Sequence, residues 1–238
     1  MNICCYFEKE HLGKLIQALT LLGSCNADSI GEAEKRTKLD VQLKDTELTN
    51  RFIKEHKEGF FLHSSKGLFD VSTHETTFST VCFYPFGKLT DKEVISVLKA
   101  CASAHAEFGY AADEDEYEYR NRIRVEFSGS EAEAWVGRNL SKYLSGLYYF
   151  TLLSRKQISE KSIDLEGLKA NAISVFELRD DVVLLKFFEN SALWEDEKDK
   201  IDQLCHSNKN IFYKDEVICE AQYSPNIMDF IMKTRAWD

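Results

Sequence analysis

The sequence has only two prolines, Pro85 and Pro225, and no Gly/Ser-rich linker in its 238 residues. Domain boundaries usually fall in exposed linkers of that composition, so no boundary of an independent domain is visible. A chain of this length with 44% hydrophobic residues can bury a substantial core. We therefore expect an α+β fold over residues 1–238, a mainly antiparallel sheet flanked by amphipathic helices, either as one compact unit or as two lobes, 1–112 and 113–238.

Long apolar runs are also missing, since none approaches the roughly 20 residues that a transmembrane helix needs. Residues 1–10 lack the basic start and apolar stretch of a signal peptide, and so we expect a cytoplasmic protein. The seven cysteines are odd in number and lack the spacing of a disulfide framework. We expect reduced thiols, as is usual in that compartment.

The motifs of common catalytic sites are absent from the sequence. It contains no G-x-S-x-G turn for a nucleophilic serine and no Gly-rich phosphate loop. Its six histidines form no H-E-x-x-H zinc motif. Cys101 and His105 have the spacing to share a helix face, but a buried cysteine beside a boundary histidine is the commoner explanation. We therefore expect no enzyme, no catalytic residue, no metal and no cofactor.

Basic residues are too few to balance the acidic ones: 30 Lys and Arg stand against 40 Asp and Glu, a formal charge of −10. Such a chain is repelled by the phosphates of nucleic acids, and we expect it to bind neither nucleic acid nor membranes. A basic protein partner is the natural complement. Solubility is the other explanation of an acidic composition.

The order of extended and helical patterns predicts a mixed fold. We expect strands over 3–7, 60–63, 68–71, 78–86, 147–153, 172–178 and 182–188. We expect helices over 12–22, 91–108 and 191–205, and a short helix or two over 158–168. Thr90 and Glu93 form a capping box before the second helix. Ser130 and Glu133 form another, which predicts a helix carrying Trp135. Residues 26–46 are polar and predict a long surface loop, and Ser224 is the expected N-cap of a last helix.

The acidic stretch with two tyrosines is the candidate partner-binding site. Its residues are Asp113, Glu114, Asp115, Glu116, Tyr117, Glu118 and Tyr119. We expect an exposed loop whose carboxylates steer a basic partner while the tyrosines supply contact area. A merely solvated surface is one alternative, and a Mg²⁺ site in a hydrolase is another. Arginines at 120, 122 and 124 are placed to neutralise part of this charge internally.

The run from Tyr143 to Phe150 predicts a buried strand behind a turn at Gly146. Together with the hairpin around residues 179–181, the segment 190–194 before an acidic helix and the apolar pair 211–212, it resembles the immunity protein 52 family and the related type VI immunity family for VRR-type nucleases. A looser similarity covers residues 81–99.

The resemblance implies an immunity protein, or antitoxin, that binds and neutralises a cognate secreted nuclease toxin of a type VI secretion or polymorphic toxin system. The toxin would have a restriction-endonuclease-like fold with a basic cleft, and inhibition would be stoichiometric and non-catalytic. A metal-dependent hydrolase with an unrecognised site and a structural or adaptor module stay open as alternatives, and the oligomeric state is undetermined by the sequence.

Overall fold

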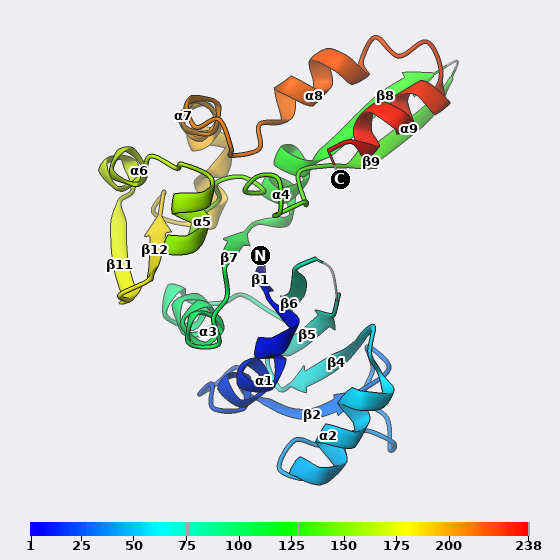
Figure 1. Cartoon of the computed structure of the whole chain (residues 1–238), viewed down its shortest axis with the longest axis vertical. Coiled ribbons are helices and arrows are strands. Elements are labelled where there is room, and N and C mark those ends of the chain that lie inside the picture. Colours follow the sequence, from blue (N-terminus) through cyan, green and yellow to red (C-terminus); the bar gives the residue numbers. More distant parts are fainter. Residues whose placement is uncertain (75–76, 128, 238) are drawn as a thin grey trace. The chain divides into compact units, whose positions relative to one another are not determined.

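The structure, a computed structural model, describes residues 1–74, 77–127 and 129–237. Two compact units are distinguished in the chain (Figure 1). Unit 1 comprises Met1–Ala111, Thr151–Lys156 and Val175–Leu184, and unit 2 comprises Ala112–Phe150, Gln157–Ser174 and Leu185–Asp238. The α+β fold class predicted from the sequence is confirmed.

Unit 1 contains almost all of a ten-stranded antiparallel sheet, with strand order β11-β12-β10-β7-β1-β6-β5-β4-β2-β3. The strands are β1 (Asn2–Phe7), β2 (Ala27–Gly31), β3 (Val41–Gln42), β4 (Gly59–Ser64), β5 (Gly67–Ser72), β6 (Ser79–Pro85), β7 (Phe108–Ala112), β10 (Phe150–Ser154), β11 (Ser174–Arg179) and β12 (Val182–Lys186). The helices of unit 1 are α1 (Leu12–Thr20), α2 (Thr46–Glu55) and α3 (Asp91–Ser103), and α5 (Arg155–Glu160) begins there.

Apolar runs without polar alternation become the strands that are buried on both faces. Residues 3–7 of β1 are all buried, and β1 pairs with β6 in the register Ile3↔Phe83. All five residues of β12 are buried as well. Such strands are covered on both sides and consist mainly of apolar residues. The exception in β12 is Lys186, whose ammonium group donates to the Glu189 carbonyl oxygen (2.8 Å). The predicted strands at 3–7, 60–63, 68–71 and 78–86 and the hairpin of β11 and β12 are confirmed.

The capping box before α3 is confirmed in both directions. The backbone N–H of Glu93 donates to Thr90 Oγ1 (3.3 Å), and the backbone N–H of Thr90 donates to Glu93 Oε2 (3.0 Å). Each side chain satisfies an amide that the first turn of the helix leaves unpaired. Val94, Leu98 and Cys101 then lie on the buried face of α3.

Four local predictions are wrong. The helix expected over 91–108 ends at Ser103, and Phe108 is the first residue of strand β7. The segment 26–46 contains β2 and β3 as well as loop, because β4 pairs with β2 and buries Ser29 and Ile30. The second capping box does not start a helix. Its residues form β9 (Ser130–Trp135), which pairs with β8 (Arg122–Phe127), and the alternation Glu-Ala-Glu-Ala-Trp fits a strand. The last helix, α9 (Ile227–Arg235), begins after Asn226, whose side chain accepts from Asp229 N.

The cysteines also differ from expectation. Cys4 and Cys82 lie opposite each other in the β1–β6 pair and form a disulfide, whereas the sequence predicts reduced thiols throughout. The other five are free, and all of them except Cys219 are buried. No helix in the described part of the chain is long and apolar enough to cross a membrane.

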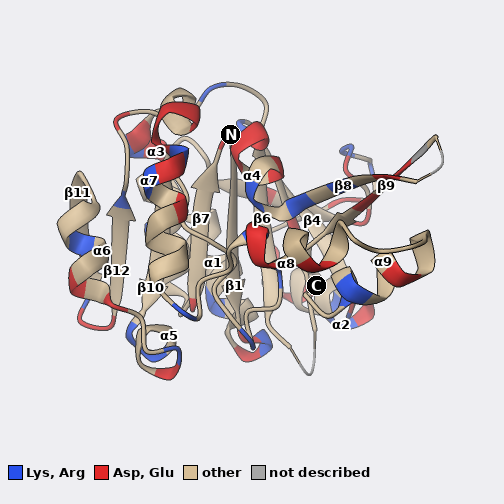
Figure 2. Ribbon diagram, turned by 90° about the horizontal axis from the view of Figure 1, so that it is seen from above, with Lys and Arg blue, Asp and Glu red and all other residues tan. Residues whose placement is uncertain are grey.

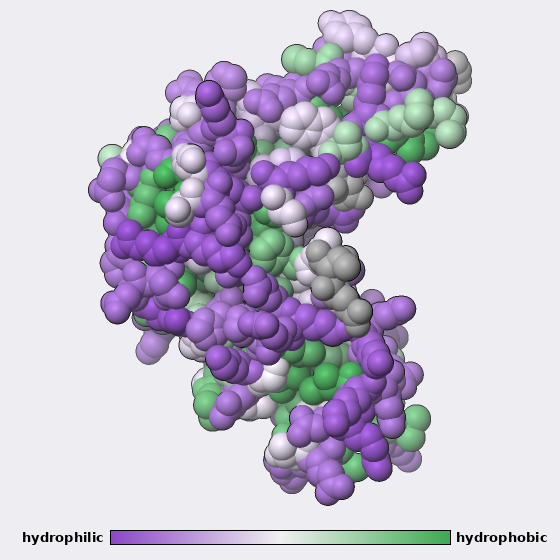
Figure 3. Space-filling model, in the orientation of Figure 1, coloured by the Kyte–Doolittle hydropathy of each residue, from purple (hydrophilic) through white to green (hydrophobic). Residues whose placement is uncertain are grey.

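Unit 2 has a hydrophobic core between the β8–β9 hairpin and the C-terminal helices. Its helices are α4 (Glu114–Asn121), α6 (Leu165–Asn171), α7 (Trp194–Ser207), α8 (Lys214–Ala221) and α9. The core residues are Ile123, Val136, Tyr143, Phe212, Val217, Ala221 and Phe230. Helix α9 lies along the hairpin (Figure 1, Figure 2), and hydrophobic side chains gather on its visible side (Figure 3).

Gly146 occupies a turn conformation that other residues adopt at a cost. Its φ is +141°, and a β-carbon there would lie 3.2 Å from Tyr148 Oη. The Tyr148 hydroxyl donates to Asn121 Oδ1 (2.7 Å) and cannot move away freely. The strand that follows begins at Phe150, three residues later than the predicted start at 147.

We expect Gly146→Ala to lower the free energy of unfolding by about 1 to 3 kcal/mol, because it strains the backbone and crowds Tyr148. Gly13→Ala is the matched control: Gly13 lies in α1, and a β-carbon added there would meet no atom within 4 Å. This control should be neutral or stabilising by up to about 1 kcal/mol. Urea denaturation measures both. Equal effects of the two substitutions would contradict the special role of Gly146.

Candidate functional site

The predicted acidic loop is a helix. Helix α4 begins after Asp113, whose carboxylate accepts from Asp115 N (3.3 Å), and its first turn carries Glu114, Asp115 and Glu116. Carboxylates in the first turn are stabilised by the unpaired amides and the helix dipole. In a loop these carboxylates would repel one another. At the start of a helix the unpaired backbone amides stabilise their negative charge.

The seven predicted residues divide into an exposed group and an inner group. Glu114 and Asp115 are exposed, and Asp113 and Glu118 are partly buried. Tyr117 and Tyr119 are partly buried, while Glu116 is fully buried. The expectation that the whole stretch is exposed is wrong, because a helix turns every fourth residue of this segment toward the interior of unit 2.

Glu116 belongs to a buried ion network with Arg120 and Asp202. The Arg120 Nε lies 3.4 Å from Glu116 Oε1, and Arg120 Nη1 donates to Asp202 Oδ1 (2.7 Å). The backbone N–H of Tyr149 donates to Glu116 Oε2 (3.4 Å). Arg120 is 5% exposed. The network joins α4 to α7 and to the chain that enters β10.

The two tyrosines are held by contacts inside unit 2. Tyr119 donates to Asp202 Oδ2 (2.8 Å) and packs against Trp194 with ring centroids 5.4 Å apart. Lys214 Nζ donates to the Tyr119 carbonyl oxygen and lies 4.0 Å from its ring centroid. Tyr117 stacks on Trp135 at 5.4 Å. Both rings therefore support the position of α4 from within unit 2.

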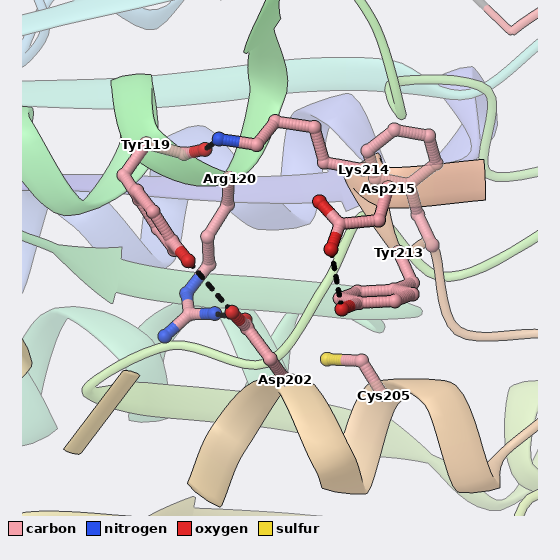
Figure 4. A pocket seen from close by; sticks show the side chains of 8 residues that line it. Tyr119, Arg120, Asp202, Cys205, Tyr213, Lys214 and Asp215 are labelled. Carbon is pink, nitrogen blue, oxygen red and sulfur yellow. Dashed lines mark hydrogen bonds and ion pairs between the residues drawn. The ribbon is translucent and has the colours of Figure 1, made fainter. Parts of the chain in front are cut away.

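A small pocket lies beside this network (Figure 4). It is lined by Tyr119, Arg120, Asp202, Cys205, Phe212, Tyr213, Lys214 and Asp215. Its volume of about 10 Å³ has room for about one water molecule. The pocket is too small for a substrate, and the side chains around it mainly bind one another.

Burial shifts the protonation of several of these groups. Desolvation raises the pKa of Glu116 to about 7, although the charge of Arg120 opposes the shift. Desolvation also raises the pKa of the Cys205 thiol to about 11 and lowers the pKa of Lys214. Shifted values mark functional sites and structural ion networks alike. Here the cause is burial of charge between α4 and α7.

An open groove of about 310 Å³ is also lined by Tyr119 and Lys214. Its lining residues are Asp115, Glu118, Tyr119, Arg122, Arg124 and Lys214. Glu118 Oε2 accepts from Arg122 Nη1 (2.7 Å) and Arg124 Nη2 (3.3 Å). The expected internal neutralisation of the acidic stretch is thus confirmed, and this groove has mixed charge.

Most of the net charge belongs to unit 2. It contains 22 Asp and Glu against 14 Lys and Arg, whereas unit 1 contains 18 against 16. Exposed carboxylates lie on α4, α7 and α8, the helices joined by the buried network (Figure 2). They are Glu114, Asp115, Glu195, Asp196, Asp199, Asp215, Glu216 and Glu220. We call these eight residues the acidic residues of the α4–α7–α8 cluster.

Ligand atoms for a metal ion converge in unit 1 instead of in the acidic stretch. Among the described residues, Glu8, Glu10 and His11 form such a group, with all ligand atoms within 4.8 Å of one another. Glu8 is already paired with Lys156 Nζ (2.6 Å). His105 stacks on His11, and its ring nitrogens face Lys14 and Arg179, which disfavours a cation beside them.

No protein-family model and no curated protein matches the chain. A solved structure of a T6SS protein from Pseudomonas aeruginosa is similar, with a TM-score of 0.54 and 16% sequence identity. The match covers 99% of this chain and 81% of that one. At this identity the similarity shows a shared fold. The specific immunity families that the sequence resembles stay predictions.

The buried carboxyl of Glu116 predicts an unusual pH dependence of stability. Its pKa is raised from 4.5 to about 7 on folding, so the folded state holds this proton more tightly than the unfolded chain does. The resulting stabilisation is fully present below pH 4.5 and is lost as the pH rises through 7. By linkage its size is of the order of 3 kcal/mol.

Glu116→Gln keeps the neutral form at every pH. We expect the stability of the wild type relative to this variant to fall between about pH 5 and pH 8, because only the wild type must ionise a buried carboxyl. Urea denaturation at several pH values measures the difference. Glu114→Gln, on the exposed side of α4, controls for the loss of one carboxylate, and an identical pH profile for both variants would contradict the burial of Glu116.

Proposed function

We propose that this protein is an immunity protein that binds and neutralises a cognate secreted nuclease toxin of a type VI secretion or polymorphic toxin system. It acts stoichiometrically in the cytoplasm and has no catalytic activity of its own. The observation that carries this proposal is the concentration of exposed carboxylates on α4, α7 and α8 of unit 2. The family resemblance of residues 135–212 and the fold shared with a T6SS protein support it.

Electrostatics explains how such a surface would recognise a nuclease. A nuclease must present positive charge to DNA phosphates, and an inhibitor with a carboxylate surface complements that charge. Steering between opposite charges raises association rates to about 10⁸ to 10⁹ per molar per second at low salt. The toxin in this proposal has a restriction-endonuclease-like fold, and its basic cleft is the region that the acidic residues cover.

The buried network makes these carboxylates a rigid surface. Arg120 and Asp202 connect α4 to α7, and Lys214 connects the start of α8 to the backbone of Tyr119. A surface that is already ordered loses little conformational entropy on binding. In this proposal Asp113, Glu114 and Asp115 contact the toxin directly. Glu116, Tyr117 and Tyr119 act as supports of the interface, and Glu118 is shared with Arg122 and Arg124.

A metal-dependent hydrolase is the second candidate, and the convergence of Glu8, Glu10 and His11 is the observation in its favour. Its ligand set is weak, because Glu8 pairs with Lys156 and Glu10 is exposed. Turnover by the purified protein with Mg²⁺, Mn²⁺ or Zn²⁺ that is abolished by His11→Ala would support the hydrolase and contradict the proposal of a binding protein.

The test of the proposal uses the proteins encoded next to this chain's own gene. A toxin among them should kill cells when expressed alone and should be tolerated when this protein is expressed with it. Purified toxin and immunity protein should form a complex with a Kd in the nanomolar range or below. Absence of rescue by this protein with every neighbouring toxin candidate would overturn the proposal.

Charge reversal locates the interface. We expect the triple variant Glu114→Lys, Asp115→Lys, Asp196→Lys to associate with the toxin about tenfold more slowly at low salt and to show a weaker salt dependence, because steering depends on these charges. All three residues are exposed, so folding should be retained. Stopped-flow kinetics at two ionic strengths measure the effect.

The matched control reverses three exposed acids of unit 1, Glu34, Glu47 and Glu55, and changes the net charge by the same amount. It should slow association clearly less than the variant on α4 and α7. Equal slowing by both triple variants would show that total charge acts alone and that the α4–α7–α8 cluster is not the interface.

A further inference from the structure

Helix α9 has one face in the core of unit 2 and one face in solvent. On the inner face Phe230 is fully buried, Thr234 is buried, and the Phe230 ring meets Phe127 of β8 with centroids 5.7 Å apart. The outer face carries four apolar side chains with large exposed fractions: Ile227 41%, Met228 66%, Ile231 43% and Met232 64%. Their spacing places them on one stripe of the helix (Figure 3).

The outer stripe is not what holds α9 in place. Phe230 on its inner face anchors the helix to β8, while the Asn226 cap (3.0 Å to Asp229 N) and the ion pair between Asp229 and Lys233 (2.8 Å) stabilise the helix itself. Clustered exposed apolar side chains mark interaction sites on soluble proteins. Methionine is suited to such sites, because its flexible thioether adapts to different partners.

Arg235 gives the stripe a charged end. It lies four residues after Ile231 and three after Met232, and so it continues the same face of the helix. It is exposed, and within the described residues its side chain makes no ion pair or hydrogen bond. A carboxylate is the group that a guanidinium binds best, in a paired geometry. A matching surface therefore combines apolar side chains with an acidic one.

Charge decides between a second copy of this chain and another protein. The single acidic residue of α9, Asp229, is already paired with Lys233 (2.8 Å), so the same face of a second copy offers Arg235 no free carboxylate. We infer that the outer face of α9 (Ile227, Met228, Ile231, Met232 and Arg235) docks against an amphipathic helix of a different protein, whose apolar face is flanked by acidic residues. Two such helices pack by interdigitating their side chains. The inference is independent of the proposed function, since it uses none of the acidic residues of the α4–α7–α8 cluster.

The probe is a fluorescent amphipathic peptide of about 18 residues, long enough to form a helix, with leucines on one face and glutamates beside them. Its binding to the full-length protein is followed by fluorescence anisotropy. We expect Met232→Asp and Arg235→Glu each to weaken binding at least about tenfold, because one removes an apolar contact and the other the paired cation. Leu21→Asp is the control, since Leu21 is 78% exposed at the end of α1 in unit 1; it should leave binding unchanged.

A second peptide with lysines in place of the glutamates separates this face from the acidic residues of unit 2. It is free to bind those carboxylates, but its binding should not depend on Met232. Met228→Asp, also at an exposed position, repeats the test if Met232→Asp lowers thermal stability. The inference is overturned if the acidic peptide does not bind, or if Met228→Asp and Met232→Asp leave its affinity unchanged. It is also overturned if sedimentation shows a dimer that Met232→Asp dissociates, because a second copy would then cover this face of α9.

Discussion

The arrangement of unit 2 depends on the buried guanidinium of Arg120. This cation is 5% exposed and lies between Glu116 and Asp202, at 3.4 and 2.7 Å. Its Nη2 atom is buried and makes no hydrogen bond within the described part of the chain. Removing one partner from a buried pair costs about 3 to 5 kcal/mol, because a charge is left uncompensated. Arg120 of α4 therefore holds α4 to Asp202 of α7, because separating the two helices would leave a buried charge without its partner.

This constraint gives α4 two roles. Glu116 turns inward to Arg120, and the neighbouring Glu114 and Asp115 are displayed to solvent. The same helix thus stabilises unit 2 and presents charge. Unit 1 is different in character: its sheet includes β1, whose residues 3–7 are all buried, and its acidic and basic residues are close to balance, 18 against 16. The excess of carboxylates in the protein therefore belongs mainly to unit 2.

The sequence correctly predicted those helices and strands whose local residue pattern is compatible with only one type of secondary structure. A run such as residues 3–7, apolar at every position, is suited to a strand covered on both faces, and Thr90 with Glu93 caps a helix with its own atoms. The pattern at 130–135 has two interpretations, since Ser-x-x-Glu starts a helix and Glu-Ala-Glu-Ala-Trp alternates as a strand. Pairing with β8, which brings Arg124 opposite Glu133, decided for the strand.

At the candidate site, too, some features follow from the local sequence and others from contacts with distant residues. The sequence by itself determined that acidic residues and tyrosines are concentrated at 113–119 and that the arginines after them neutralise part of the charge. Only the tertiary structure decided which of these residues face solvent, because the burial of Glu116 and Arg120 depends on Asp202, 82 positions along the chain from Arg120. A local segment determines its own charge and periodicity, whereas the partner that makes a buried charge stable is supplied by a distant element.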